Sequence, residues 1–184
     1  MTAQAIFNPL EKNAHLIELC KKGDRRAQHQ IYQRYLRAMS RVAYRITGNE
    51  MEAEDVIQEA FIRAFRNLAN FKGEATFGAW LKRIVVNTSI NHVKRRKAEF
   101  VPFEPERMEI PEEHVPRYVS SYSMATIKEA IEQLPDGYKT VFSLYLFEGY
   151  DHQEIGNILN ISEATSKSQF SRAKKKLREL LAAA

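Results

Sequence analysis

The C-terminal part of the chain reads DHQEIGNILNISEATSKSQFSRAKKKLRELL over residues 151–181, and this pattern predicts two helices separated by a tight turn. Asp151 is a suitable N-cap, and Glu154 stands three residues later, where its carboxylate can reach back to the cap amide. Gly156 is small where two such helices must approach closely, and Asn160 tolerates the left-handed conformation of a sharp exit. The stretch therefore has the layout of a DNA-binding helix-turn-helix.

Ser162 is a suitable cap for the second helix of this pair, along which positive charge gathers. Residues 164–184 contain six basic side chains and one acidic, whereas residues 123–163 contain two basic and seven acidic. A basic helix on an otherwise acidic domain suits the phosphates of duplex DNA. The alternative is a solvated helix whose lysines complement the helix dipole, which explains the charges but not the turn before them. The basic residues are Lys167, Arg172, Lys174, Lys175, Lys176 and Arg178.

The whole composition is that of a soluble globular protein with one ordinary domain or two small ones. The chain has 184 residues, 44% hydrophobic and 28% charged, and its net charge of +5 favours polyanionic partners. No apolar run approaches the roughly 18 residues of a membrane span, and the first ten residues lack the pattern of a signal peptide. The single cysteine, Cys20, is predicted to be a buried thiol. We therefore expect a protein of the reducing cytoplasm, without membrane insertion.

The sequence predicts no catalytic centre, no metal site and no cofactor. The five histidines are scattered, and none has metal-ligand spacing with another histidine or with the cysteine. The seven glycines are isolated and form no phosphate-binding loop. An enzyme is therefore the least favoured class of protein.

Helical periodicity of apolar residues runs almost throughout the chain, and no stretch predicts a strand. In the N-terminal half, the pattern predicts helices over residues 24–47, 50–68 and 76–97. Gly48-Asn49 separates the first two, and a loop at residues 70–75 separates the second from the third. The predicted fold class is all-α.

The chain also divides into predicted domains. Residues 100–122 contain four prolines and five acids against two arginines, with no sustained period, which is typical of a flexible linker. We expect a helical domain at residues 1–99 and a second one, containing the helix-turn-helix, at residues 123–184. In the second domain, Ser123 and Pro135-Asp136-Gly137 begin two further helices that supply a core for the pair.

Two helices of the N-terminal half have opposite charge. The helix predicted at residues 76–97 carries six basic side chains and no acid. The helix before it begins with more carboxylates than its dipole requires, so a surface that faces another protein is the preferred interpretation, with dipole stabilisation as the alternative. These carboxylates are Glu50, Glu52, Glu54, Asp55 and Glu59.

Aromatic rings precede the basic residues of the third helix. Rings stack on unpaired bases and cations follow the phosphates, so this combination favours single-stranded nucleic acid. Phe77 and Trp80 share a helix face with Leu81 and fit a core equally well, and for Trp80 both interpretations stay open. Phe71 lies in the loop and is the better candidate for a base contact.

Three motifs resemble, in order, those of the extracytoplasmic-function sigma factors of bacterial RNA polymerase. EAEDVIQEAF at residues 52–61 resembles the family's polymerase-binding signature, and FKGEATF at residues 71–77, followed by Trp80-Leu81 and Arg83–Asn87, resembles its minus-ten segment. ISEAT at residues 161–165, with RAKKKL at residues 172–177, resembles its minus-thirty-five reader. Three motifs in family order are specific where any one alone would not be.

The resemblance implies a promoter-specificity subunit that binds core RNA polymerase and directs promoter recognition, DNA melting and transcription initiation. Its polymerase contacts would lie on the clamp helices of the largest subunit and the flap of the second-largest, and an anti-sigma factor would inhibit it. The residues implied in clamp binding are Glu54, Asp55, Gln58, Glu59 and Phe61.

The resemblance also implies two DNA-binding sets. The first would bind the minus-ten element and its melted non-template strand through Phe71, Lys72, Gly73, Thr76, Phe77, Trp80, Arg83, Asn87, Asn91, Lys94, Arg95 and Arg96. The second would bind the duplex minus-thirty-five element through Thr165, Lys167, Ser168, Gln169, Ser171, Arg172 and Lys175.

Two positions depart from the family pattern. Ser166 stands where the family usually has an aliphatic residue, and Gln169 stands where an arginine is common. Glutamine suits adenine where arginine suits guanine, so a different base preference is expected. Two other classes remain as alternatives: a stand-alone helix-turn-helix regulator, which leaves residues 71–97 without a role, and a single-strand or RNA-binding protein, which leaves the acidic helix unexplained.

Overall fold

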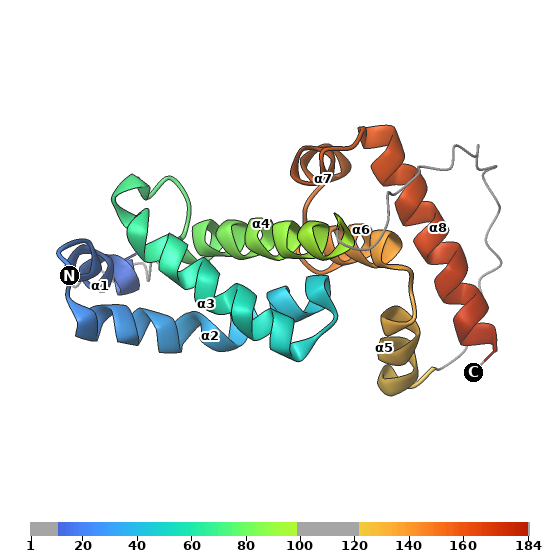
Figure 1. Ribbon diagram of the computed structural model, residues 1–184, viewed down its shortest axis with the longest axis horizontal. Coiled ribbons are helices and arrows are strands. Elements are labelled where there is room, and N and C mark those ends of the chain that lie inside the picture. The colour runs from blue at the N-terminus through green and yellow to red at the C-terminus, as the bar shows by residue number, and fades with distance from the viewer. Residues whose placement is uncertain (1–10, 99–121, 184) are drawn as a thin grey trace, which may run out of the picture. The chain divides into compact units, whose positions relative to one another are not determined.

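The computed structural model describes residues 11–98 and 122–183, which form eight α-helices, one 3-10 helix and no strand (Figure 1). The all-α prediction is confirmed for this part of the chain. Contacts divide the chain into two compact units, Met1–Arg96 and Lys97–Ala184. Apart from Tyr122, the predicted linker at residues 100–122 lies outside the described residues.

The first unit begins with a helix that the sequence did not lead us to expect, and this helix packs on α2 and on the 3-10 helix. Cys20, near its C-terminal end, is buried as predicted, and burial raises the pKa of its thiol. The elements are α1 (Glu11–Lys21), α2 (Arg25–Thr47), α3 (Glu50–Arg66), the 3-10 helix η1 (Leu68–Asn70) and α4 (Phe77–Ala98).

Local signals set the break between α2 and α3, which pack against each other. Helix α2 ends at Gly48, whose φ of 71° is left-handed and whose N–H donates to the carbonyl of Tyr44. Glycine adopts this conformation without a Cβ clash. Asn49 then caps α3, and its side-chain oxygen accepts the N–H of Glu52 at 3.1 Å. The predicted break at Gly48-Asn49 is confirmed.

Helix α3 ends two residues earlier than predicted. Asn67 caps it: the side-chain amide of Asn67 donates to the carbonyl of Arg63 at 2.9 Å. Leu68 is still buried, but it belongs to η1. An apolar residue at helical spacing therefore extended the predicted helix past its real end.

Helix α4 is buried on more than one side, because polar residues lie among its apolar ones. Thr88 and Ser89 are buried next to Val85 and Val86. Their hydroxyls donate to the carbonyls of Ile84 and Val85, both at 2.8 Å, so neither hydroxyl is left unsatisfied.

The second unit is a small helical domain in which α8 contacts each of the other three helices. Its core centres on Leu134, Phe142 and Ala173, with Phe170 packed against them. Ser123 and the Pro135-Asp136 junction begin helices, as predicted. The elements are α5 (Met124–Glu132), α6 (Asp136–Leu146), α7 (His152–Leu159) and α8 (Glu163–Ala182).

Candidate polymerase and nucleic-acid interfaces

Helix α3 exposes most of the residues predicted to bind the polymerase. Glu54, Asp55 and Gln58 are exposed, whereas Val56 and Ile57 are buried in the first unit. The helix period produces this division, because positions three and four apart share a face. The exposed side of α3 can therefore present carboxylates and an amide to another protein.

The other two residues of the predicted set differ from these three. Glu59 is half-buried and forms ion pairs with Arg63 and, at 3.5 Å, with Arg95. Phe61 is only 3% exposed, and its ring lies edge-on to that of Tyr32 at 4.8 Å. Its side chain belongs to the core of the unit, so the structure does not place Phe61 on the surface that a direct contact requires.

Ion pairs join the acidic helix to the basic end of α4. Arg96 donates to both carboxylate oxygens of Glu52, at 2.9 and 3.1 Å, and His92 lies 3.4 Å from the same group. With the Glu59–Arg95 pair, two arginines of the predicted minus-ten set are bound to α3. The opposite charges noted in the sequence thus hold the two helices together as well as marking surfaces.

Helix α4 also carries a polar row along one side. Arg83, Asn87, Asn91 and Lys94 are all exposed and follow one another at steps of four, four and three residues. This spacing places them on one face of a helix. Cations and amides in such a row can contact successive phosphates and base edges.

The predicted aromatic residues form one cluster at the start of α4. The centroids of Phe71, Phe77 and Trp80 lie 5.4 to 5.6 Å from each other, and Tyr35 lies 5.3 Å from Phe77. Phe77 is buried and Trp80 is half-buried. Phe71 is only 9% exposed, so it is not the free ring at a loop tip that the sequence favoured.

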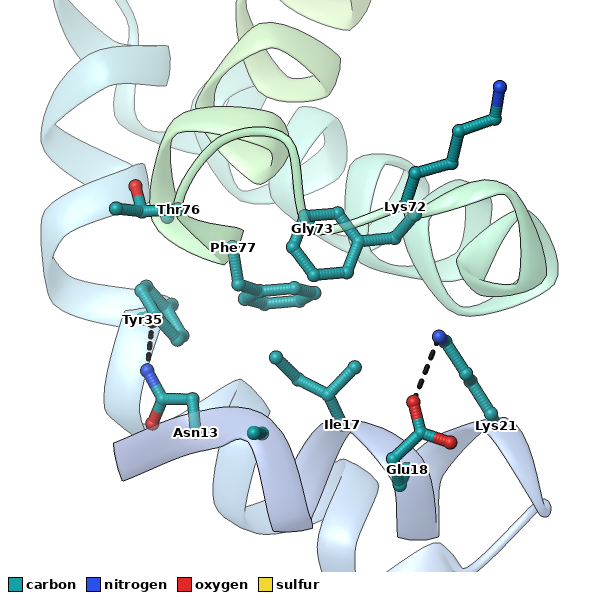
Figure 2. A pocket seen from close by; sticks show the side chains of 12 residues that line it. Asn13, Ile17, Glu18, Lys21, Tyr35, Lys72, Gly73, Thr76 and Phe77 are labelled. Carbon is teal, nitrogen blue, oxygen red and sulfur yellow. Dashed lines mark hydrogen bonds and ion pairs between the residues drawn. The ribbon is translucent and has the colours of Figure 1, made fainter. Parts of the chain in front are cut away.

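A pocket of about 460 Å³ lies between α1 and the segment that leads into α4 (Figure 2). Ile17 on α1 points toward the ring of Phe77, and the Glu18–Lys21 ion pair, 2.9 Å long, borders the pocket. Residues of the minus-ten set that line it are Phe71, Lys72, Gly73, Thr76 and Phe77. The α1 residues that line it, Asn13, Ala14, Ile17, Glu18 and Lys21, had no place in the sequence prediction.

In the second unit, α7, its turn and α8 form the predicted helix-turn-helix. The capping box is present: the Asp151 side chain accepts the N–H of Glu154 at 2.7 Å, and Glu154 accepts that of Asp151 at 2.9 Å. Asn160 has a left-handed φ of 59°. A Cβ on Gly156 would lie 2.8 Å from the carbonyl oxygen of Ile161, so the helices do approach closely there. These predictions of local geometry are confirmed.

The predicted minus-thirty-five residues lie along α8 and its first turns. Lys167 and Lys175 are exposed, and Glu163 pairs with Lys167 at 2.6 Å and raises the pKa of its ammonium group, which therefore stays charged. The remaining members are half-buried: Thr165, Ser168, Gln169, Ser171 and Arg172.

Ser166, the unusual residue of this helix, is fully buried and has a polar partner. Its Oγ lies 2.9 Å from Nδ1 of His152 on α7. The His152 ring stacks on Tyr145 at 4.6 Å and lies edge-on to Phe170 at 5.6 Å. A hydrogen bond thus joins α7 to α8 where the family usually packs an aliphatic side chain. The sequence contained both residues but no local signal that joins them.

Comparison with known proteins gives matches over both units. Residues 31–99 match the family model described as Sigma-70 region 2, and residues 124–177 match Sigma-70, region 4. The ECF RNA polymerase sigma factor SigW of Bacillus subtilis is 36% identical over 90% of this chain and 94% of its own length. The chain belongs to the extracytoplasmic-function sigma factors.

Two further comparisons agree with this membership. The RNA polymerase sigma-H factor of Pseudomonas aeruginosa is 32% identical over 93% of this chain and 94% of its own length. A solved sigma factor from Bartonella quintana, RpoE in complex with the anti-sigma factor NepR, shares the fold with a TM-score of 0.55 and 23% identity. That match covers 83% of this chain and 95% of the solved one.

This extracytoplasmic-function sigma factor is a transcription initiation factor that binds core RNA polymerase and directs it to promoters. None of its described helices combines the length and apolarity needed to cross a membrane. Residues 11–98 and 122–183 also contain no group of three or more acidic, histidine or cysteine side chains placed to hold a metal ion.

Proposed function

We propose that the work of this sigma factor is divided between two domains, residues 1–99 and 123–184, joined by a flexible linker at residues 100–122. The first domain binds core polymerase through α3 and the minus-ten element through α4. The second binds the minus-thirty-five element through α8. The proposal rests above all on one observation: the first unit exposes carboxylates on α3 and a separate row of cations and amides on α4.

For polymerase docking, the proposed contacts are Glu54, Asp55 and Gln58, with Glu59 at the border. Their partner is the clamp helices of the largest polymerase subunit, and the flap of the second-largest subunit binds the second domain. Exposed carboxylates favour a basic partner surface and orient its approach. Phe61 supports this surface from beneath, since its side chain is buried.

For the melted promoter, the α4 row follows the non-template strand. Arg83 and Lys94 contact phosphates, and Asn87 and Asn91 contact base edges, as their donors and acceptors allow. Arg95 and Arg96 add positive charge beside this row while paired with α3. The Phe71–Thr76 segment and the aromatic cluster lie at the start of the same helix and serve an unstacked base.

For the duplex upstream element, α8 enters the major groove. Lys167, Arg172 and Lys175 neutralise phosphates, and Gln169 reads a base edge with a preference for adenine. Thr165, Ser168 and Ser171 supply shorter hydroxyl contacts along the same helix.

We further propose that the protein acts in the cytoplasm, is not an enzyme, needs no cofactor, and is controlled by an anti-sigma factor. The last point is supported by two structural relatives whose solved forms are complexes: RpoE with the anti-sigma factor NepR, and CnrH with the cytosolic domain of CnrY.

A reciprocal pair of variants tests the division of labour. The double variant Asp55→Arg, Gln58→Ala should lose core polymerase in a pull-down, while its binding to upstream duplex DNA is retained. The double variant Lys167→Ala, Arg172→Ala should retain the polymerase, while its duplex binding weakens and becomes less sensitive to salt. Each variant is the control for the other. Normal polymerase binding by the first would contradict the docking surface, and an unchanged salt slope in the second would move the duplex contact elsewhere.

A further inference from the structure

We propose that the pocket between α1 and residues 71–78 takes one unstacked nucleobase, and that α1 is the wall that reads its edge. The inference rests on the proposed function, because that function brings a melted strand to α4. It goes beyond it by assigning the pocket itself and by giving α1 a role in sequence preference. The pocket is formed entirely by elements of the first unit.

The size and lining of the pocket suit a base. Its volume of about 460 Å³ falls in the range of small-ligand sites. Three aromatic side chains line it, from Tyr35, Phe71 and Phe77, and Ile17 faces Phe77 from α1 (Figure 2). Enzymes and binding proteins hold extruded bases between such aromatic and apolar side chains. Because every base has a flat apolar face, this part of the lining accepts any of the four.

Asn13 supplies the polar group that can discriminate among bases. Its amide N–H donates to the Tyr35 hydroxyl at 2.6 Å, and Arg34 donates to its side-chain oxygen. Burial raises the pKa of Tyr35, so its hydroxyl stays protonated. An amide has two N–H groups and two oxygen lone pairs. These two contacts therefore fix its plane while leaving one donor and one acceptor for the edge of a base.

Charges at the border separate the base from its phosphate. Lys21 is neutralised by Glu18 at 2.9 Å, so this side of the pocket carries no net charge. Lys72 is exposed and extends away from the pocket, toward solvent (Figure 2). A backbone phosphate outside the pocket and a neutral base inside it match this arrangement.

Removal of single bases, combined with filling of the pocket, tests the inference. Holoenzyme is formed with core polymerase and bound to fork-junction DNA of a promoter that the protein transcribes, with one abasic site placed at each non-template position in turn. Ala14 lines the pocket but is exposed, so Ala14→Phe can fill the pocket without disturbing the core. In the wild type, removal of the bound base should weaken affinity by about five- to 150-fold.

Ala14→Phe holoenzyme should have this loss already, and at that one position an abasic site should cost it nothing more. The same abasic profile in Ala14→Phe and in the wild type, at every position, would overturn the inference. A wild-type protein that fails to bind core polymerase would show itself before any DNA is added. That result would contradict the proposed function and, with it, this inference.

Asn13→Ala tests the reading of the edge, with His15→Ala as the matched control. His15 is exposed on the same helix and does not line the pocket. At the pocket position, the four bases should differ by about two- to tenfold in the wild type and in His15→Ala, and this preference should disappear in Asn13→Ala. Preferences at the other positions should remain, which distinguishes reading from a general loosening of α1. An unchanged preference at the pocket position would show that Asn13 does not read the base.

Discussion

Replacement of Gly156 by alanine should damage the helix-turn-helix, although alanine is the better helix former. An added Cβ would lie 2.8 Å from the carbonyl oxygen of Ile161 and 3.6 Å from the backbone nitrogen of Glu163. The first distance is too short for real atoms. The obstacle is backbone, and the N–H of Ile161 also donates to the carbonyl of Gly156 at 3.0 Å. The turn therefore cannot move aside without loosening its own hydrogen bond.

The magnitude follows from two opposing terms. Alanine gains about 0.8–1.0 kcal/mol over glycine in a helix interior. Overpacking costs about 1–3 kcal/mol, and a rigid backbone obstacle puts this site in the upper half of that range. The net loss should be about 1–2 kcal/mol, confined to the second unit. A loss of this size multiplies the open fraction of α7 and α8 by about 5–30.

Hydrogen exchange on the full chain measures this directly, because peptides from residues 152–182 report local opening. Their protected amides should exchange about 5–30 times faster in Gly156→Ala, while peptides from α2 and α3 stay unchanged. Asn157→Ala is the matched control, since Asn157 is exposed on the same helix and should gain or keep protection. Unchanged or slower exchange in Gly156→Ala would refute the close approach of the two helices.

Three further predictions concern contacts between helices. Ser166→Ala removes the hydrogen bond to His152 and should cost the second unit about 0.5–1 kcal/mol, seen as faster exchange in α7 and α8; no change would mean that the bond contributes nothing. Burial lowers the pKa of His152 below its usual 6.5, so the unfolded chain holds the proton more tightly. The second unit should therefore lose stability as pH falls below about 6.5, and His152→Gln should lose less; equal pH dependence would contradict this. In urea unfolding followed by Trp80 fluorescence, Glu52→Ala and Arg96→Ala should show a coupling free energy of roughly 0.5–1 kcal/mol, whereas additive effects would show no working ion pair.

Local chemistry explains why much of the fold could be predicted from the sequence. Asp151, Gly48 and Asn160 each act within a few residues, so their caps and turns follow from residue type alone. Helices α2 and α4 begin within one residue of the predicted positions for the same reason. The exposed face of α3 also follows from the helix period.

What escaped prediction depends on contacts between distant segments. Phe71 lies in a loop, as expected, yet it is buried because Phe77 and Trp80 lie against it. Ser166 is paired with a residue 14 positions away, and no local pattern joins the two. The α1 wall of the pocket was missed because its role arises from packing against the segment that begins α4.

Run-off transcription on sheared genomic DNA tests the central claim most directly. Core polymerase alone should give no discrete products, and addition of the wild-type chain should give a defined set of transcripts whose upstream sequences share two elements. The Asp55→Arg, Gln58→Ala variant should give none. Discrete transcripts from core polymerase alone, or none on addition of a chain that still binds duplex DNA by itself, would contradict the account and favour a stand-alone regulator.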